Sequence, residues 1–353
     1  MTEVENNLPV LVTGANGYVA SWIVKKLLEK GYTVHATVRN PNDEKKVKHL
    51  LQAAQKEPGT LKLFKADLLE EGSFEDAMKG CGIVMHTASP FKSRNIKKPM
   101  AELIDPAKKG TKNVLDTVNK AASVERVVLT SSVAAVFGDI KEFKKSGKSA
   151  FNETDWNTTS SAKRQPYFYS KTVAEKLAWE MHDQQSRWTM TTINPGMVFG
   201  PALSTSSRSE SIQVLRDFGT GLMLFGAPKL TFAAVDVRDV AEAHILAASN
   251  DKASGRHILA SDSINYMDIS KTLKKHFGGR FPFPRFAIPN WMVYLVAPFV
   301  GLERQFVKDN MGYPLKLDAS YAKKDLGIQF TPLKQTLVDH FQQQLDDGLV
   351  KRW

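Results

Sequence analysis

The sequence predicts an α/β protein with a doubly wound parallel sheet and a smaller, mostly C-terminal lobe. In the first half of the chain, short apolar runs rich in β-branched residues alternate with amphipathic helical stretches. That alternation is typical of a parallel sheet with helices on both faces. After residue 200 the alternation stops, which indicates a second unit. The 353 residues, 42% of them hydrophobic, are enough to build both.

Six strands are predicted in the first part of the chain, at residues 10–13, 33–38, 61–65, 83–87, 126–130 and 189–193. The sixth strand follows a helix that starts near Tyr167. Residues 235–244 predict a short strand that leads into a helix returning to the sheet. Residues 278–284 contain the loop-forming run GGRFPFP.

Composition excludes several classes of protein. The net charge is +11, but the clusters of Lys and Arg contain no interleaved aromatic residues. We therefore expect a basic surface and no nucleic-acid partner. Cys81 is the only cysteine, and the first ten residues lack an apolar leader, so the expected location is cytoplasmic. The eight histidines form no close ligand pair, and no metal is expected. The apolar stretch 286–302 contains prolines and predicts a buried or substrate-facing helical segment, with no membrane partner.

A glycine-rich turn joins the first predicted strand to the first predicted helix. Its sequence, TGANGYVA at residues 13–20, places backbone N–H groups and a helix N-terminus where a pyrophosphate binds in Rossmann-type proteins. Gly14 permits the tight turn, and Gly17 lets phosphates approach the backbone. The candidate cofactor contacts in the turn are Gly14, Asn16, Gly17, Tyr18 and Val19.

The end of the second strand bears on which dinucleotide binds. An NAD site usually has an acidic residue there for the ribose hydroxyls, whereas this chain has Arg39. A guanidinium suits a 2′-phosphate, and Lys45 or Lys46 can add a second charge nearby, so NADP is favoured. Further along the sheet edge, Asp67 and Leu68 are candidates for framing the adenine. Thr87, Ala88 and Ser89 are small enough to leave room for the dinucleotide.

Three residues form the candidate catalytic set. Tyr167 and Lys171 are four residues apart on one face of a helix, so the ammonium is expected near the phenol. Together with an oxidised nicotinamide, the ammonium should lower the phenol pKa. Ser132 ends the fifth strand, at the carboxyl edge where such sheets bind ligands, and its hydroxyl can bond a substrate carbonyl.

The chain resembles the extended short-chain dehydrogenase/reductase superfamily over nearly its whole length. The motifs look most like the branch of dihydroflavonol 4-reductases, cinnamoyl-CoA reductases and yeast-type methylglyoxal/ketone reductases. The motifs that carry the resemblance are TGANGYVA, VRN, DLL, TASP, TSS, YFYSK, NPGMVFGP and VDVRDVAEAH.

The resemblance implies an NADPH-dependent carbonyl reductase, in which hydride goes to a ketone or aldehyde and Tyr167 is the general acid. It implies that Tyr167 and Lys171 also contact the cofactor, Lys171 at the nicotinamide ribose, and that Pro195 to Val198 hold the carboxamide. Residues 1–200, completed by about 231–260, would be the NADP-binding Rossmann domain, and 201–230 with 261–353 the substrate-binding lobe. The chain departs from the plant flavonoid reductases at Phe137, where they carry an asparagine, which favours a smaller or more apolar carbonyl compound. Candidate pocket residues are Phe91, Phe137, Met197, Met223 and Phe225.

Two other functions compete with this interpretation. An NAD-dependent nucleotide-sugar epimerase or dehydratase shares the fold, but such dehydratases place an Asp-Glu pair where Val133 and Ala134 follow Ser132. A hydroxysteroid dehydrogenase is a more distant relative. A non-catalytic dinucleotide-sensing protein is the other alternative. Such proteins can lose the Tyr/Lys pair freely, whereas this chain has both residues. A small-molecule carbonyl substrate is the expected partner, and composition is compatible with either a monomer or a homodimer.

Overall fold

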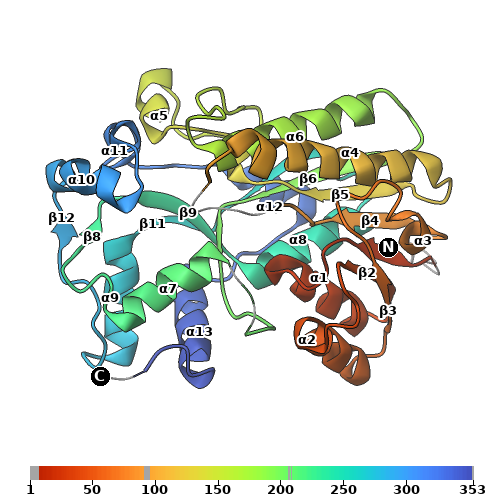
Figure 1. Ribbon diagram of the computed structural model, residues 1–353, viewed down its shortest axis with the longest axis horizontal. Coiled ribbons are helices and arrows are strands. Elements are labelled where there is room, and N and C mark those ends of the chain that lie inside the picture. Colours follow the sequence, from red (N-terminus) through yellow and green to blue (C-terminus); the bar gives the residue numbers. More distant parts are fainter. Residues whose placement is uncertain (1–7, 91–95, 206, 208, 352–353) are drawn as a thin grey trace.

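A computed structural model describes residues 8–90, 96–205, 207 and 209–351, apart from the side chains of 144–146. Its centre is a seven-stranded parallel sheet with the order β10-β6-β5-β4-β1-β2-β3, which confirms the predicted Rossmann-type fold (Figure 1). The six predicted strands are all present. The strands are β1 (Val10–Val12), β2 (Thr33–Val38), β3 (Thr60–Lys65), β4 (Ile83–His86), β5 (Arg126–Thr130), β6 (Thr189–Pro195) and β10 (Gly255–Leu259).

Helices cover both faces of this sheet (Figure 1). One face packs against α1 (Tyr18–Glu29), α2 (Glu44–Lys56), α8 (Val237–Ser249) and α12 (Ser320–Leu326), and the other against α3 (Glu75–Met78), α4 (Asp105–Lys120) and α6 (Pro166–Asp183). Within β1, Val10 and Val12 belong to the first core layer and Leu11 to the second, because successive side chains of a strand alternate. The sheet is therefore buried on both sides, as its apolar strands predict.

Two small sheets and several helices form a smaller lobe at one end of the main sheet (Figure 1). In the first sheet, β9 (Thr231–Asp236) lies between β7 (Met197–Phe199) and β11 (Asp262–Asn265). Its aromatic core includes Phe218 and Phe341. Three helices surround this core: α7 (Glu210–Thr220), α9 (Tyr266–Phe277) and α13 (Leu333–Asp346). The second sheet pairs β8 (Ala227–Pro228) with β12 (Ala287–Ile288). Beside it lie α10 (Asn290–Val296) and α11 (Arg304–Asn310), and α5 (Ile140–Ser146) packs against α11.

The chain passes between the two parts several times. The strand predicted near residue 235 is β9 of the small sheet, whereas the helix that follows it, α8, packs against the main sheet. Further along, α12 returns to the main sheet, where Ala322 and Leu326 join its core. The division into 1–200 with 231–260 and the remainder therefore stays a proposal.

The apolar stretch 286–302 does not form one buried helix, and its predicted position facing the substrate stays a prediction. It forms β12, α10 and a short 3₁₀ helix (Ala297–Val300), and several of its large side chains face outward. Trp291 is 65% exposed and Phe299 is 89% exposed, because the two prolines divide the stretch into pieces too short to bury every side. Among the described residues, no helix combines the length and apolar character that crossing a membrane requires.

Candidate active site

The turn between β1 and α1 has the geometry that its glycines predict. Gly14 has a φ of 64°, and a Cβ there would lie 3.0 Å from the Cβ of Ala88. Both its conformation and its neighbour therefore require glycine. Gly17 is the N-cap of α1 and is exposed, so the first N–H groups of the helix open onto the space above the turn.

Thr13 joins this turn to the end of β4. Its hydroxyl oxygen accepts hydrogen bonds from the backbone N–H groups of Thr87, at 3.1 Å, and Ala88, at 3.0 Å. The Thr13 hydroxyl also bonds Nδ1 of His86, at 2.9 Å. The predicted contacts at Gly14 and at 87–89 therefore lie side by side, and Ser89 is half-buried next to them.

Tyr18 contributes to the site mainly as a structural residue. Its hydroxyl donates a 2.5 Å hydrogen bond to the carbonyl of Gly200, and burial raises its pKa. This bond fixes the segment that follows β7, and Val198 within β7 is half-buried. The other two candidates of the turn, Asn16 and Val19, are half-buried, and Val19 also packs against the core of the main sheet.

The residues predicted to read the adenosine end lie after β2, in the first turn of α2 and after β3. Arg39 is exposed and forms no ion pair with any described residue. Lys46 is also exposed, but its ammonium lies 3.0 Å from the carboxylate of Asp43. Asp67 accepts a 2.9 Å hydrogen bond from the backbone N–H of Leu69, which shapes the turn after β3. Its neighbour Leu68 is half-buried.

The candidate catalytic residues come together at the carboxyl edge of the sheet. Ser132 follows β5, and its side chain hydrogen-bonds the phenol of Tyr167 in the first turn of α6. The Ser132 hydroxyl also accepts from the N–H of Ala134 at 3.2 Å and lies 3.4 Å from the carbonyl of Pro195. One turn further along α6, the Lys171 ammonium lies 3.4 Å from the carbonyl of Thr130.

Burial dominates the electrostatics of this group. It raises the pKa of Tyr167 to about 12, against the lowering effect of the hydrogen bond from Ser132. In the protein alone, desolvation disfavours the phenolate more than its neighbours stabilise it. The predicted lowering of the phenol pKa, which includes the effect of an oxidised nicotinamide, stays a prediction. Burial also lowers the pKa of Lys171 to about 8, and the negative charge of Glu175 opposes that change.

Glu175 and its partners are site residues that the sequence reasoning missed. The carboxylate is fully buried behind Lys171 and accepts hydrogen bonds from the Ser131 hydroxyl, from Nδ2 of Asn194 at 2.7 Å and from Nε of Arg256 at 2.6 Å. Asn194 also donates to the backbone carbonyl of Ser132, at 3.2 Å. The signal was present, since Tyr167, Lys171 and Glu175 continue one spacing of four residues along the same helix face.

The candidate pocket residues differ widely in exposure. Phe137 is 6% exposed and stacks on Phe151 at 5.3 Å between ring centroids, so it belongs to an aromatic core. Phe225 is 83% exposed. Met197 and Met223 are half-buried against the core of the smaller lobe, and Phe91 lies outside the described residues.

The described part of the chain holds no cluster of three or more His, Cys, Asp or Glu side chains placed to bind a metal ion.

The parallel sheet, the glycine turn and the Tyr/Lys pair on α6 define an NAD(P)-dependent oxidoreductase of the short-chain dehydrogenase/reductase type. The chain belongs to the extended branch of that superfamily, the NAD dependent epimerase/dehydratase family, whose model matches residues 10–260.

Curated relatives match the chain over nearly its whole length. It is 40% identical to a cinnamoyl-CoA reductase, CAD2, of Medicago truncatula over 332 residues, which cover 93% of each protein. It is 33% identical to a dihydroflavonol 4-reductase of Gerbera hybrida, with 98% of this chain and 87% of the relative covered. Both relatives bear the names of reductases.

Solved structures share the fold. The yeast methylglyoxal/isovaleraldehyde reductase Gre2, complexed with NADPH, superposes with a TM-score of 0.76 at 30% identity, and the match covers 97% of this chain and 100% of Gre2. MoeE5, in complex with UDP-glucose and NAD, has a TM-score of 0.73 at 21% identity over 96% of this chain and 99% of that one, which shows the fold alone.

Proposed function

We propose that the protein is an NADPH-dependent carbonyl reductase that reduces a ketone or aldehyde to an alcohol. The observation that carries the proposal is the hydrogen bond between Ser132 and Tyr167, with Lys171 one helical turn away. A hydroxyl, a phenol and an ammonium in this order are the groups that carbonyl reduction needs. The reductase names of the relatives support the same reaction.

The residues at the sheet edge fit a dinucleotide. A Cβ at Gly14 would fill the space above the turn and meet Ala88, whereas glycine leaves the backbone open to a pyrophosphate. Arg39, exposed and without an ion pair to the described residues, suits a 2′-phosphate, and the NADPH complex of Gre2 supports this preference. When bound, NADPH supplies the hydride. The single cysteine supports a cytoplasmic location.

The chain's own groups handle the substrate oxygen. Because burial raises the pKa of Tyr167 to about 12, the phenol keeps its proton at neutral pH and can give it to the oxygen that gains negative charge. The Ser132 hydroxyl is placed to donate a hydrogen bond to the same oxygen. Lys171 orients the ribose, and its positive charge stabilises the phenolate that remains once the proton has been given.

Tyr167→Phe tests the proposed chemistry. The purified protein is assayed by loss of reduced-nicotinamide absorbance with NADPH and NADH in parallel, against small ketones, aldehydes and aryl carbonyls. We expect turnover with NADPH by the wild type and a kcat about a hundredfold or more lower in the variant, because the phenyl ring packs alike but has no proton to donate. NADPH binding, followed by fluorescence, should be retained. Full turnover by the variant would exclude Tyr167 as the acid.

Arg39→Asp tests the proposed cofactor preference. Replacing a guanidinium by a carboxylate removes the partner of the 2′-phosphate and adds repulsion, so kcat/KM for NADPH relative to NADH should fall by about tenfold or more. Lys46→Ala is the matched comparison. It should have a smaller effect, because that ammonium already pairs with Asp43. An unchanged ratio in Arg39→Asp would show that Arg39 does not read the phosphate.

A further inference from the structure

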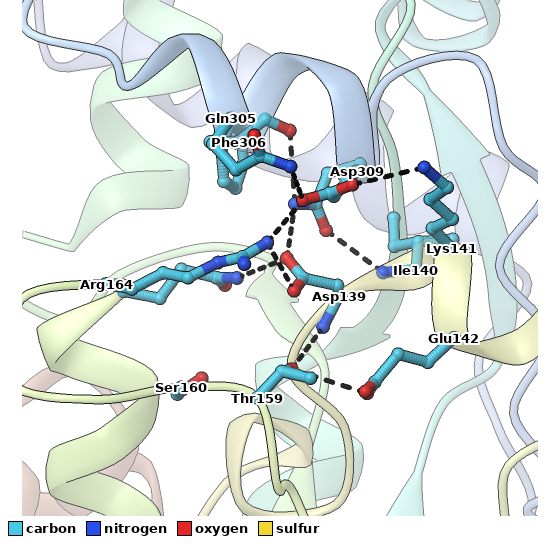
Figure 2. Close-up of polar contacts among 12 residues, drawn as sticks. Asp139, Ile140, Lys141, Glu142, Thr159, Ser160, Arg164, Gln305, Phe306 and Asp309 are labelled. Atoms are coloured by element: carbon cyan, nitrogen blue, oxygen red, sulfur yellow. Dashed lines mark hydrogen bonds and ion pairs between the residues drawn. The ribbon is translucent and has the colours of Figure 1, made fainter.

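A buried cluster of polar side chains connects the smaller lobe to the start of the helix that carries Tyr167 (Figure 2). We call it the Asp139 cluster, and it consists of Asp139, Arg164, Gln165, Asp309 and Asn310. Two of its members immediately precede α6, two lie at the end of α11, and Asp139 immediately precedes α5.

Gln165 has an unusual backbone conformation. Its φ is 51°, and among the residues that the structure describes it is the only non-glycine residue with a positive φ. A side chain with a Cβ disfavours this left-handed region, so surrounding contacts must hold it there. Gln165 is followed by Pro166, the first residue of α6, and then by Tyr167. The conformation of Gln165 therefore sets the direction in which the first turn of α6 begins.

Asp139 supplies the contacts that hold this turn. Its Oδ1 accepts hydrogen bonds from the side-chain amides of Gln165, at 2.8 Å, and Asn310, at 2.9 Å. Its Oδ2 pairs with the guanidinium of Arg164 at 2.5 Å. The residue is 3% exposed, so its carboxylate replaces lost hydration with three donors, two of them from the turn before α6.

The same residue is fixed relative to Ser132. The segment between Ser132 and Asp139 is hydrogen-bonded to the loop that leads to α6. In that loop Asn157 donates from Nδ2 to the carbonyl of Ala134 at 2.8 Å. Gly138 lets the two segments meet, since a Cβ there would lie 2.1 Å from Oγ1 of Thr159. Asp139 is thus linked both to the segment that carries Ser132 and to the turn that precedes Tyr167.

The contact with α11 brings the smaller lobe into this arrangement. Besides donating to Asp139, Asn310 accepts a 3.0 Å hydrogen bond from the N–H of Ile140 through its Oδ1. Asp309 pairs with Arg164 at 2.5 Å, so the guanidinium lies between two carboxylates (Figure 2). The two carboxylates, of Asp139 and Asp309, are balanced by the two cations of Arg164 and Lys141. The Lys141 ammonium lies 3.5 Å from the Asp309 carboxylate.

We propose that Asp139 is a positioning residue for the reduction: through Gln165 it holds the first turn of α6, and hence the Tyr167 phenol, against Ser132. Through Asn310 it ties that position to the smaller lobe. The inference rests on the proposed function, since it assigns Tyr167 as the group whose position matters. A misplacement of a reacting group by about 1 Å costs up to about a hundredfold in rate, so a small rotation of this turn is enough to be measured.

The test compares three variants of the full chain in the carbonyl assay. Asp139→Ala removes all three contacts and should lower kcat by about tenfold or more while leaving the Kd for NADPH within about twofold. Asp139→Asn keeps the shape and one acceptor oxygen and should restore part of kcat. Gln165→Gly keeps the left-handed backbone accessible while removing the side-chain contact, and it should also lower kcat.

A double-mutant cycle separates positioning from general stability. If Asp139 acts through Gln165, then Asp139→Ala should cost much less kcat in the Gln165→Gly background than in the wild type. Asp309→Asn is the matched control, because it discharges the second carboxylate and leaves the contacts of Asp139 intact. It should change kcat by less than about twofold.

The outcomes are distinguishable from failure of the proposed function. A wild type that reduces no carbonyl would overturn the reductase assignment, and the positioning role with it. A wild type that turns over, together with unchanged kcat in Asp139→Ala, would overturn the positioning role alone. Additive losses in Asp139→Ala and Gln165→Gly would also overturn it, as would a loss of kcat in Asp309→Asn as large as that in Asp139→Ala. Should Asp139→Ala fail to fold, Gln165→Gly decides by itself, since normal kcat there contradicts the mechanism.

Discussion

Glu175 is a buried carboxylate that affects the pKa of the Lys171 ammonium. It lies one turn beyond Lys171 on α6, and its carboxylate is fully buried and shared by Ser131, Asn194 and Arg256. Burial lowers the pKa of Lys171, and Glu175 acts in the opposite direction, which leaves the pKa at about 8. The carboxylate therefore helps to keep the ammonium charged at neutral pH.

Glu175→Gln should move the pH dependence of the reaction. Without the negative charge the pKa of Lys171 falls further, so the decline of kcat/KM with rising pH should begin about one pH unit lower than in the wild type. The variant should also lose about 3 kcal/mol or more of stability, because Arg256 is left buried without its carboxylate. Initial rates between pH 6 and about 9 provide the measurement, in the pH range set by the Lys171 value of about 8.

The control for this experiment is Glu180→Gln, which removes an exposed carboxylate from the same helix. Its pH profile should match that of the wild type. An unshifted profile in Glu175→Gln, measured on folded protein, would mean that Glu175 does not tune the ammonium.

At the residue scale, the sequence predicts the candidate reactive groups better than their surroundings. Ser132, Tyr167 and Lys171 could be proposed as one group because a strand end and a four-residue helical spacing are local patterns. The packing of Phe137 could not be predicted, since only the folded loop shows that Phe151 stacks on it. The effect of burial on the Tyr167 pKa could not be predicted either, because burial depends on segments distant in the sequence.

At the scale of elements, the strands of the main sheet were predictable because each is a short apolar run between helices. All three residues of β1 and the first four of β5 are buried, which is the pattern of a strand covered on both faces. β10 escaped prediction because its first two residues, Gly255 and Arg256, are not apolar. Its pairing with β6 is long-range and has no local signal.

The burial expected of the stretch 286–302 was not found, for a different reason. Its composition predicts burial, but Pro289 and Pro298 each limit the helix that the apolar residues would otherwise continue. The resulting α10 has seven residues, too few to turn all its apolar side chains toward one neighbour. Composition indicates whether a segment prefers burial, whereas the available partner surface decides how much of it is covered.

At the scale of the whole molecule, buried histidines link stability to pH. His86, His244 and His340 are at most 2% exposed, and they lie on three elements that meet around the main sheet and the smaller lobe. Burial lowers their pKa values to about 3, 4 and 3 respectively. In the unfolded chain each would titrate near pH ~6.5. The unfolded state therefore binds more protons than the folded state between these values.

The protein should consequently be acid-sensitive. Above pH ~6.5 the contribution of the three histidines is fully present, and as the pH falls below that value each removes up to about 1.4 kcal/mol of unfolding free energy per pH unit, until its folded pKa is reached. Urea denaturation midpoints at pH 7.5, 6.5 and 5.5 measure the effect. The loss between pH 6.5 and 5.5 should exceed that between 7.5 and 6.5.

His340→Gln identifies one contributor to this slope. Nδ1 of His340 accepts a 3.1 Å hydrogen bond from the N–H of Gly200, and a glutamine oxygen can accept the same bond without titrating. Protonation would place two donors face to face, so the variant should lose less stability than the wild type between pH 6.5 and 5.5. His276→Gln, at an exposed position on α9, should leave the slope unchanged. If the midpoint did not fall at acid pH, or fell equally in His340→Gln and the wild type, the buried imidazoles would not be its cause.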